Sequence, residues 1–247
     1  MRYLGGKTRL VPFLSEAVSR AQRPHYIEPF VGGGSVLAAL APKFASVEAG
    51  DAHPDLIELW NATIDGWEPP ELVTEADYAR LRDADVSPLR AYAGFACSFG
   101  GKWFGGYARK SDGTPDQAGS RASLLRKAAQ MRPHISRLHQ KSFEEYAPGP
   151  DSIVYCDPPY VTSADYSTGT WRPYDFWDSV RDWTSNGAAV LVSEFQAPRD
   201  FVPVAQTERT VAIKRTTASR GKASERLFTH VSTVELFSTE YPQEEAA

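Results

Sequence analysis

An aspartate, two prolines and a tyrosine occur in a row, Asp157-Pro158-Pro159-Tyr160, directly after the apolar run 153–156. The run is rich in strand-forming residues and predicts a buried strand, so the carboxylate comes at a strand end. Proline has a fixed φ and no N–H, and it pushes the residue before it out of the helical region. The Pro158 carbonyl is therefore held in a nearly fixed direction beside the carboxylate. An ordinary turn after a strand is the alternative.

Such a group of side chains suits methyl transfer to a planar amine. The exocyclic amine of adenine is a poor nucleophile because its lone pair is delocalised into the ring. Two acceptors on its two hydrogens would favour attack, since they become better partners as positive charge develops on the nitrogen. Asp157 can supply one acceptor and the Pro158 carbonyl the other, while Tyr160 offers a face on which an extruded base can stack. We therefore take Asp157, Pro158, Pro159 and Tyr160 as the candidate catalytic residues.

A glycine loop comes early in the chain. Residues 26–31 read as a strand that runs into Gly32-Gly33-Gly34-Ser35, and residues 36–40 open a helix. Glycines let the backbone approach a ligand closely, and a helix start adds unpaired N–H groups. The loop has neither the phosphate-binding pattern nor a strict dinucleotide fingerprint. A plain structural turn is the alternative.

Two charged residues strengthen the case for a ligand site. Asp51 follows Gly32 by about 20 positions, where an α/β nucleotide site holds ribose hydroxyls. Its alternative role is to cap the next helix. Lys7 begins a predicted amphipathic helix, where the helix dipole disfavours a cation. Binding an anionic ligand group would explain a lysine there, and a solvated surface lysine is the alternative.

Taken in order, these motifs resemble those of the Dam-type DNA adenine-N6 methyltransferases. The matching residues are Tyr3-x-x-Gly6-Lys7, Glu28-Pro29-Phe30-x-Gly32-x-Gly34-Ser35, Asp51 and Asp157-Pro158-Pro159-Tyr160. They span nearly the whole chain and leave about residues 60 to 140 least constrained. The resemblance implies S-adenosylmethionine as methyl donor, and double-stranded DNA with a flipped-out adenine as substrate.

The resemblance also implies which residues bind the donor. By position, Tyr3 and Lys7 would contact its methionine end and Asp51 its ribose, while Asp157 would lie between donor and base. The implied donor-binding residues are Tyr3, Gly6, Lys7, Glu28, Pro29, Phe30, Gly32, Gly34, Ser35, Asp51 and Asp157.

Other functions compete with adenine-N6 transfer. Cytosine-N4 transfer is a rival because the same geometry serves that amine, although aspartate rather than serine before Pro-Pro favours adenine in families similar to this one. Methylation of RNA or of a protein amide is less favoured. An inactive DNA-binding regulator that kept the fold is a further alternative, against which the intact Asp157 motif and Lys7 argue. Whether a cognate restriction nuclease exists is left open.

The charge distribution bears on DNA binding. The net charge is −4, which does not by itself indicate a nucleic-acid partner. Basic residues nevertheless predominate between Lys102 and Lys141, where only Asp112 and Asp116 oppose them. A local basic face is what contact with phosphates requires. For residues 121–137 a solvated helix face is the alternative.

Two segments combine aromatic residues with glycine or small polar residues. In the loop 99–108, Trp103, Phe104 and Tyr107 could wedge into DNA while nearby cations hold phosphates, and core packing of the insertion is the alternative. In the loop 161–172, two aromatics could stack on the extruded base or merely anchor the loop. The candidate DNA-binding residues are Lys102, Trp103, Tyr107, Arg109, Lys110, Arg126, Tyr166 and Trp171.

The elements that must position these residues alternate along the chain. Strands are predicted at 25–29, 46–50, 152–156 and 188–193, and helices at 7–21, 34–42, 55–62 and 174–185. Segments 207–216 and 226–237 would pair antiparallel at the sheet edge. The predicted fold class is α/β: a doubly wound, Rossmann-like methyltransferase sheet with a C-terminal antiparallel hairpin and a small helical target-recognition insertion. Ligands of such a sheet bind at the carboxyl ends of its strands.

We expect residues 1–62 and 141–240 to form the S-adenosylmethionine-binding catalytic domain and residues 63–140 the target-recognition insertion. Residues 241–247 are expected to be a disordered tail. Cys97 and Cys156 make no disulfide framework, and the histidines show no metal-ligand spacing, so no metal is expected. There is no apolar run long enough to span a membrane and no signal-peptide pattern. The sequence therefore predicts a cytoplasmic protein.

Overall fold

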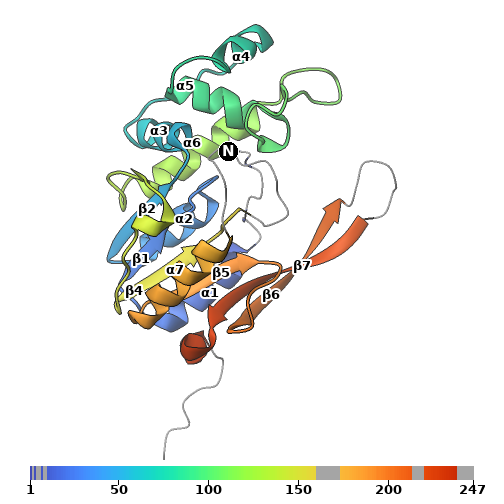
Figure 1. The fold of residues 1–247 in the computed structure, drawn as a ribbon. Helices are drawn as coiled ribbons and strands as arrows, with labels where there is room; N and C mark the ends of the chain where they lie inside the picture. Colours follow the sequence, from blue (N-terminus) through green and yellow to red (C-terminus); the bar gives the residue numbers. More distant parts are fainter. Residues whose placement is uncertain (2, 4–6, 8–9, 160–172, 213–219, 238–247) are drawn as a thin grey trace, which may run out of the picture.

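A single seven-stranded sheet organises the structure, a computed structural model that describes residues 1, 3, 7, 10–159, 173–212 and 220–237 (Figure 1). The strands are β1 (His25–Glu28), β2 (Ser46–Asp51), β3 (His139–Gln140), β4 (Ser152–Cys156), β5 (Ala189–Glu194), β6 (Phe201–Ala212) and β7 (Arg220–His230). Their order across the sheet is β3-β2-β1-β4-β5-β7-β6. The first five run parallel, and β7 pairs antiparallel with both β5 and β6. The α/β sheet with a C-terminal antiparallel hairpin is thus confirmed.

Both faces of the sheet are covered, as continuous apolar strands require. Every residue of β4 and β5 is buried. Because successive side chains of a strand point to opposite faces, Ile153 and Tyr155 join one hydrophobic core and Val154 and Cys156 the other. The first core includes α1 (Val11–Ala21), α2 (Ser35–Leu40) and α3 (Pro54–Ile64), and the second includes α7 (Pro173–Ser185).

The segment between β2 and β4 is mainly helical and gathers at one end of the sheet (Figure 1). It contains α4 (Glu75–Leu81), α5 (Pro88–Ala91), a π-helical turn (Tyr92–Ala96), a 3-10 turn (Phe99–Gly101) and α6 (Ala118–Met131). Buried side chains of α6, Leu124 and Met131 among them, belong to the same core as α2 and α3. This segment therefore shares its core with the sheet.

The hairpin boundaries differ from the sequence prediction. β6 begins at Phe201 rather than 207, and β7 ends at His230 rather than 237. Val231–Phe237 forms 3-10 turns instead. The Thr233 hydroxyl donates to the His230 carbonyl, and the Val231 N–H donates to Asp200 O. The local side-chain bond of Thr233 competes with strand pairing, so the alternating pattern past His230 does not extend the strand.

None of the described helices is long and apolar enough to cross a membrane. Within the residues that the structure describes, no group of three His, Cys, Asp or Glu side chains gathers as metal ligands would.

Candidate active site

Three acidic residues follow or end neighbouring parallel strands, and their side chains meet at one edge of the sheet. Glu28 ends β1, Asp51 ends β2 and Asp157 follows β4. The strands lie side by side in the order β2-β1-β4, with Ile27 of β1 in register with Val154 of β4. The negative charge of Asp157 raises the pKa of both Glu28 and Asp51, in each case as an addition to the larger effect of burial. Asp157 thus lies close enough to Glu28 and Asp51 for its charge to act on both.

Asp157 is held by a lysine. Its Oδ1 atom lies 2.6 Å from Nζ of Lys7, a residue that precedes α1. Lys7 is buried, with 5% of its surface exposed. A buried ammonium requires such a partner, because a charge without one is costly to remove from water. The ion pair orients the carboxylate at the strand end. Pro158, which follows it, is buried and Pro159 is half-buried.

Asp51 joins the glycine loop to α3. Its Oδ2 atom accepts from Gly32 N at 3.0 Å and its Oδ1 atom from His53 N, also at 3.0 Å. Burial raises the pKa of Asp51 to about 6, against the lowering effect of these backbone hydrogen bonds. Ala52 also contributes a backbone hydrogen bond, so three of the roughly four lone-pair sites of the carboxylate are engaged and about one remains for a further donor. The contact with Gly32 goes beyond the capping role that the sequence left open.

The glycines are required by close contacts as well as by backbone shape. Gly32 and Gly34 have φ of +47° and +62°, where L side chains are strained. A Cβ on Gly32 would lie 2.8 Å from Cε1 of Tyr3. A Cβ on Gly34 would lie 2.6 Å from Cε of Met131 and 2.7 Å from Cζ2 of Trp60. The loop is therefore packed between Tyr3 on one side and Met131 and Trp60 on another.

Glu28 lies beneath the loop rather than on its surface. It is 1% exposed, and its Oε2 atom accepts from the Tyr26 hydroxyl at 2.6 Å. Burial raises the pKa of Glu28 to about 8, the bond from Tyr26 opposes this shift, and the charge of Asp157 adds to it. Glu28 is thus mainly protonated at neutral pH. The nearby Phe30 is half-buried and packs against Phe143 and Phe176.

Two further residues at the site were not predicted from the sequence. Lys127 of α6 donates from Nζ to Gly33 O at 2.6 Å and to Ser35 Oγ at 2.7 Å. Burial lowers the pKa of Lys127 to about 8. Its signal in the sequence was helical spacing, because Lys127 falls on the face that carries Leu124 and Met131.

The second is His53, which precedes α3. It is buried, and its Nδ1 atom has no hydrogen-bond partner among the described atoms. Its ring packs edge-on against Phe95 and Trp103. Burial lowers the pKa of His53 to about 4, with the charge of Arg90 adding to the shift, so the ring is neutral. No motif in the sequence distinguished it.

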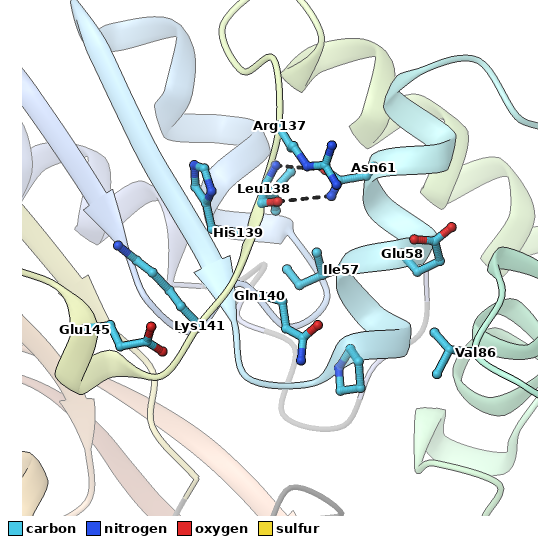
Figure 2. A pocket seen from close by; sticks show the side chains of 11 residues that line it. Ile57, Glu58, Asn61, Val86, Arg137, Leu138, His139, Gln140, Lys141 and Glu145 are labelled. Carbon is cyan, nitrogen blue, oxygen red and sulfur yellow. Dashed lines mark hydrogen bonds between the residues drawn. The ribbon is translucent and has the colours of Figure 1, made fainter.

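A pocket of about 360 Å³ lies beside this site, between α3 and the residues around β3 (Figure 2). Gln140, which pairs with Asp51 in the sheet, lines it. Asn61 holds its rim by two hydrogen bonds with the backbone of Leu138 (Figure 2). The side chains around it carry both signs of charge, Glu58 and Lys141 included. The pocket adjoins the Asp51 end of the site and lies apart from Asp157.

Residues 3–89 match the family model of D12 class N6 adenine-specific DNA methyltransferases. This range contains Lys7, the glycine loop and Asp51. Over this range the chain is similar to that family. Curated relatives include the DNA adenine methylase of Vibrio cholerae serotype O1, which is 26% identical over an alignment of 272 residues. The alignment covers 92% of this chain and 94% of the relative. The DNA adenine methylase of Haemophilus influenzae is 29% identical over 190 residues, 65% of this chain and 63% of the relative.

Among solved structures, an rRNA methylase from Streptococcus thermophilus is similar, with a TM-score of 0.37 and 11% sequence identity. The similarity covers 89% of this chain and 96% of that one.

The candidate DNA-binding residues divide into exposed cations and packed aromatics. The side chains of Lys102, Arg109, Lys110 and Arg126 are exposed, and Arg109 pairs with Glu75. Trp103 is half-buried, with ring contacts to His53, Phe95 and Phe104 and the Arg90 guanidinium over its face. This packing favours the structural alternative that the sequence left open for Trp103.

Tyr107 is also tied into the fold. Its hydroxyl donates to Val73 O at 2.6 Å and accepts from Gln117 Nε2 at 2.9 Å. The predicted residues Gly6, Tyr160, Tyr166 and Trp171 lie outside the described residues.

Proposed function

We propose that this methyltransferase transfers the methyl group of S-adenosylmethionine to N6 of an adenine flipped out of double-stranded DNA. The observation that carries the proposal is the position of Asp157, paired with Lys7 at the same sheet edge as the glycine loop and Asp51. In this proposal residues 1–62 and 141–240 bind the donor and carry the catalytic residues. Residues 63–140 contact the DNA.

The residues at this edge fit the donor. The backbone of the loop from Gly32 to Ser35 can come close to a ligand, because Gly32 and Gly34 carry no side chain and adopt positive φ. The helix that begins at Ser35 adds unpaired N–H groups. The Asp51 carboxylate stands at the strand end next to the loop and can accept from a ribose hydroxyl with the lone pair that the backbone leaves free. Glu28, Pro29 and Phe30 support the loop from below.

Lys7 can serve donor and carboxylate together. An ammonium group has three N–H donors in tetrahedral directions. One is directed to Asp157, and another can reach an anionic group such as the carboxylate at the methionine end of the donor. Tyr3, which lies against Gly32, bounds the same space. Lys7 thereby links donor placement to the orientation of Asp157.

The bound donor supplies an electrophilic methyl group on a sulfonium. Asp157 and the Pro158 carbonyl accept the two N6 hydrogens and so favour localisation of the nitrogen lone pair. As the N6–methyl bond forms, the carbon–sulfur bond breaks and its electron pair stays on sulfur. The positive charge that appears on N6 strengthens both hydrogen bonds, and one N6 proton then leaves to solvent. Tyr160 is proposed to stack on the base.

The exposed cations of the insertion are proposed to contact phosphates. Lys102, Arg109, Lys110 and Arg126 are long, charged and accessible, which suits backbone contacts that position a duplex without reading its sequence.

Mass spectrometry of digested DNA tests the proposal. Unmethylated genomic DNA is incubated with the protein and a donor labelled in its methyl group. We expect label in N6-methyladenine. Label in N4-methylcytosine would support the cytosine alternative instead, and a protein that binds no donor would support the inactive regulator.

A further inference from the structure

A lysine from the helical insertion reaches across to the glycine loop. Lys127 is 7% exposed, and its Nζ atom donates to Gly33 O and Ser35 Oγ. Lys127 lies 94 residues after Gly33 and 92 residues after Ser35 in the sequence. Burying an ammonium is costly unless its donors are satisfied. Here two of its three donors bond to the loop.

Neighbouring contacts hold the same loop from the same side. Trp60 Nε1 donates to Gly32 O at 3.0 Å. Met131, one helical turn after Lys127, leaves no room for a side chain at Gly34. The carbonyls of Gly32 and Gly33 and the Ser35 hydroxyl are thus all engaged by side chains from α3 and α6. Glycine populates many backbone conformations in the absence of such contacts, so these bonds select one of them.

We propose that Lys127 is a positioning residue for the methyl donor, holding the glycine loop in its donor-binding conformation from within the insertion. The inference rests on the proposed function, since the ligand of the loop is the donor named there. Lys127 acts through Gly33 and Ser35 and takes no part in the methyl transfer itself. The helix that holds the donor loop also carries Arg126, a candidate DNA contact.

The substitution Lys127→Met tests this role. Methionine keeps the length and apolar contacts of the lysine stem but removes the ammonium, so Gly33 O loses a charge-assisted partner. We expect calorimetry to show donor binding weakened about tenfold. We expect KM for the donor to rise in parallel, while kcat at saturating donor stays within about twofold of the wild-type value. A role in overall stability alone would not separate KM from kcat in this way.

Lys43→Met is the matched control, because Lys43 is an exposed lysine outside the insertion. It should leave the donor Kd unchanged. Lys127→Gln provides a second variant should Lys127→Met fail to fold. Its amide keeps one hydrogen-bonding group, so we expect a donor Kd between those of the wild type and Lys127→Met.

The outcomes separate the two proposals. Absence of donor binding by the wild-type protein would overturn the proposed function itself. Tight binding by the wild type together with an unchanged donor Kd in a folded Lys127 variant would overturn the positioning role alone. A parallel loss of kcat at saturating donor would also overturn it, because the effect would then extend beyond donor placement.

Discussion

At the scale of single residues, the proposed chemistry depends on a carboxylate that a buried lysine holds at a strand end. Lys7 and Asp157 are far apart in the chain, yet their charged atoms are 2.6 Å apart. The pair gives the ammonium a counter-charge and holds the carboxylate at the strand end. Asp157 is therefore the residue whose replacement should affect methyl transfer most.

Asp157→Asn is expected to lower kcat by about 100-fold or more, because an amide is a poorer acceptor as charge develops on N6. The substitution also leaves the buried Lys7 ammonium without its counter-charge, so we expect a loss of stability beside the loss of turnover. A radiometric methylation assay measures the effect, with circular dichroism as a check of folding. Asp151→Asn, at an exposed position before β4, is the control and should retain activity. Wild-type turnover by Asp157→Asn would refute the role of the carboxylate.

Glu28→Gln tests the buried carboxyl group beneath the loop. The folded pKa of Glu28 is raised from its ordinary value of 4.5 to about 8, mainly by burial. Between these two pH values the unfolded chain has lost the proton and the folded chain keeps it, so stability falls as pH rises. Glutamine does not titrate. The stability advantage of the variant should therefore grow by roughly 2 kcal/mol between about pH 6 and about pH 9.

Denaturant unfolding of both proteins at the two pH values measures this difference. The exposed Glu58→Gln should show no comparable pH dependence. An advantage that stays constant across the range would mean that Glu28 is ionised in the folded protein well below pH 8.

At the scale of elements, the insertion is joined to the sheet through α3. Arg90 of α5 donates from one terminal nitrogen to both carboxylate oxygens of Asp55 in α3, at 2.9 and 2.8 Å. Asp55 is buried, and the guanidinium also lies over the ring of Trp103. Burial raises the pKa of Asp55, and Arg90 opposes that shift. This pair connects helices on either side of the insertion boundary.

Asp55→Asn should destabilise the fold by about 3 kcal/mol, because it leaves a largely buried guanidinium without its counter-charge. Thermal denaturation measures the effect. Glu58→Gln is the matched control, because Glu58 lies three residues after Asp55 in α3 and is exposed. It should change the melting temperature little. Equal midpoints for Asp55→Asn and the wild type would mean that the ion pair contributes no net stability.

At the scale of the whole molecule, an acidic protein is proposed to present a basic surface to DNA. The net charge of −4 is unevenly distributed, since basic residues predominate between Lys102 and Lys141. Part of this charge is engaged within the protein: Arg121 and Arg132 donate to backbone carbonyls, and the buried Lys127 bonds to the glycine loop. The basic side chains of this segment that remain exposed could contact a DNA duplex.

Lys110→Glu should therefore raise KM for DNA and reduce the dependence of DNA binding on salt by about one unit of log–log slope or more. The Kd for the donor should not change, because Lys110 is exposed and distant in sequence from the loop. Fluorescence anisotropy with labelled duplexes across a salt series measures the slope. Lys43→Glu, a charge reversal outside the basic segment, should leave it as in the wild type. Identical slopes for Lys110→Glu and the wild type would remove this residue from the DNA surface.

Much of the site was predictable because its signals are local. Pro158 and Pro159 restrict the backbone wherever they occur, and the glycines permit the positive φ that the loop adopts. Asp51 follows the loop at the spacing typical of α/β nucleotide sites, and the apolar run 153–156 predicted a buried strand. The sequence by itself thus determined the parallel sheet and the edge at which Asp157 and Asp51 meet.

Tertiary structure decided the partners. Lys127 looked like part of a basic helix face, and only packing of α6 against α2 and α3 directs it to Gly33. Trp103 had the neighbours of a DNA wedge, yet three rings and a guanidinium surround it. The physical reason is that burial and pairing depend on residues far away in the chain, whereas backbone restriction is a property of each residue and its immediate neighbours.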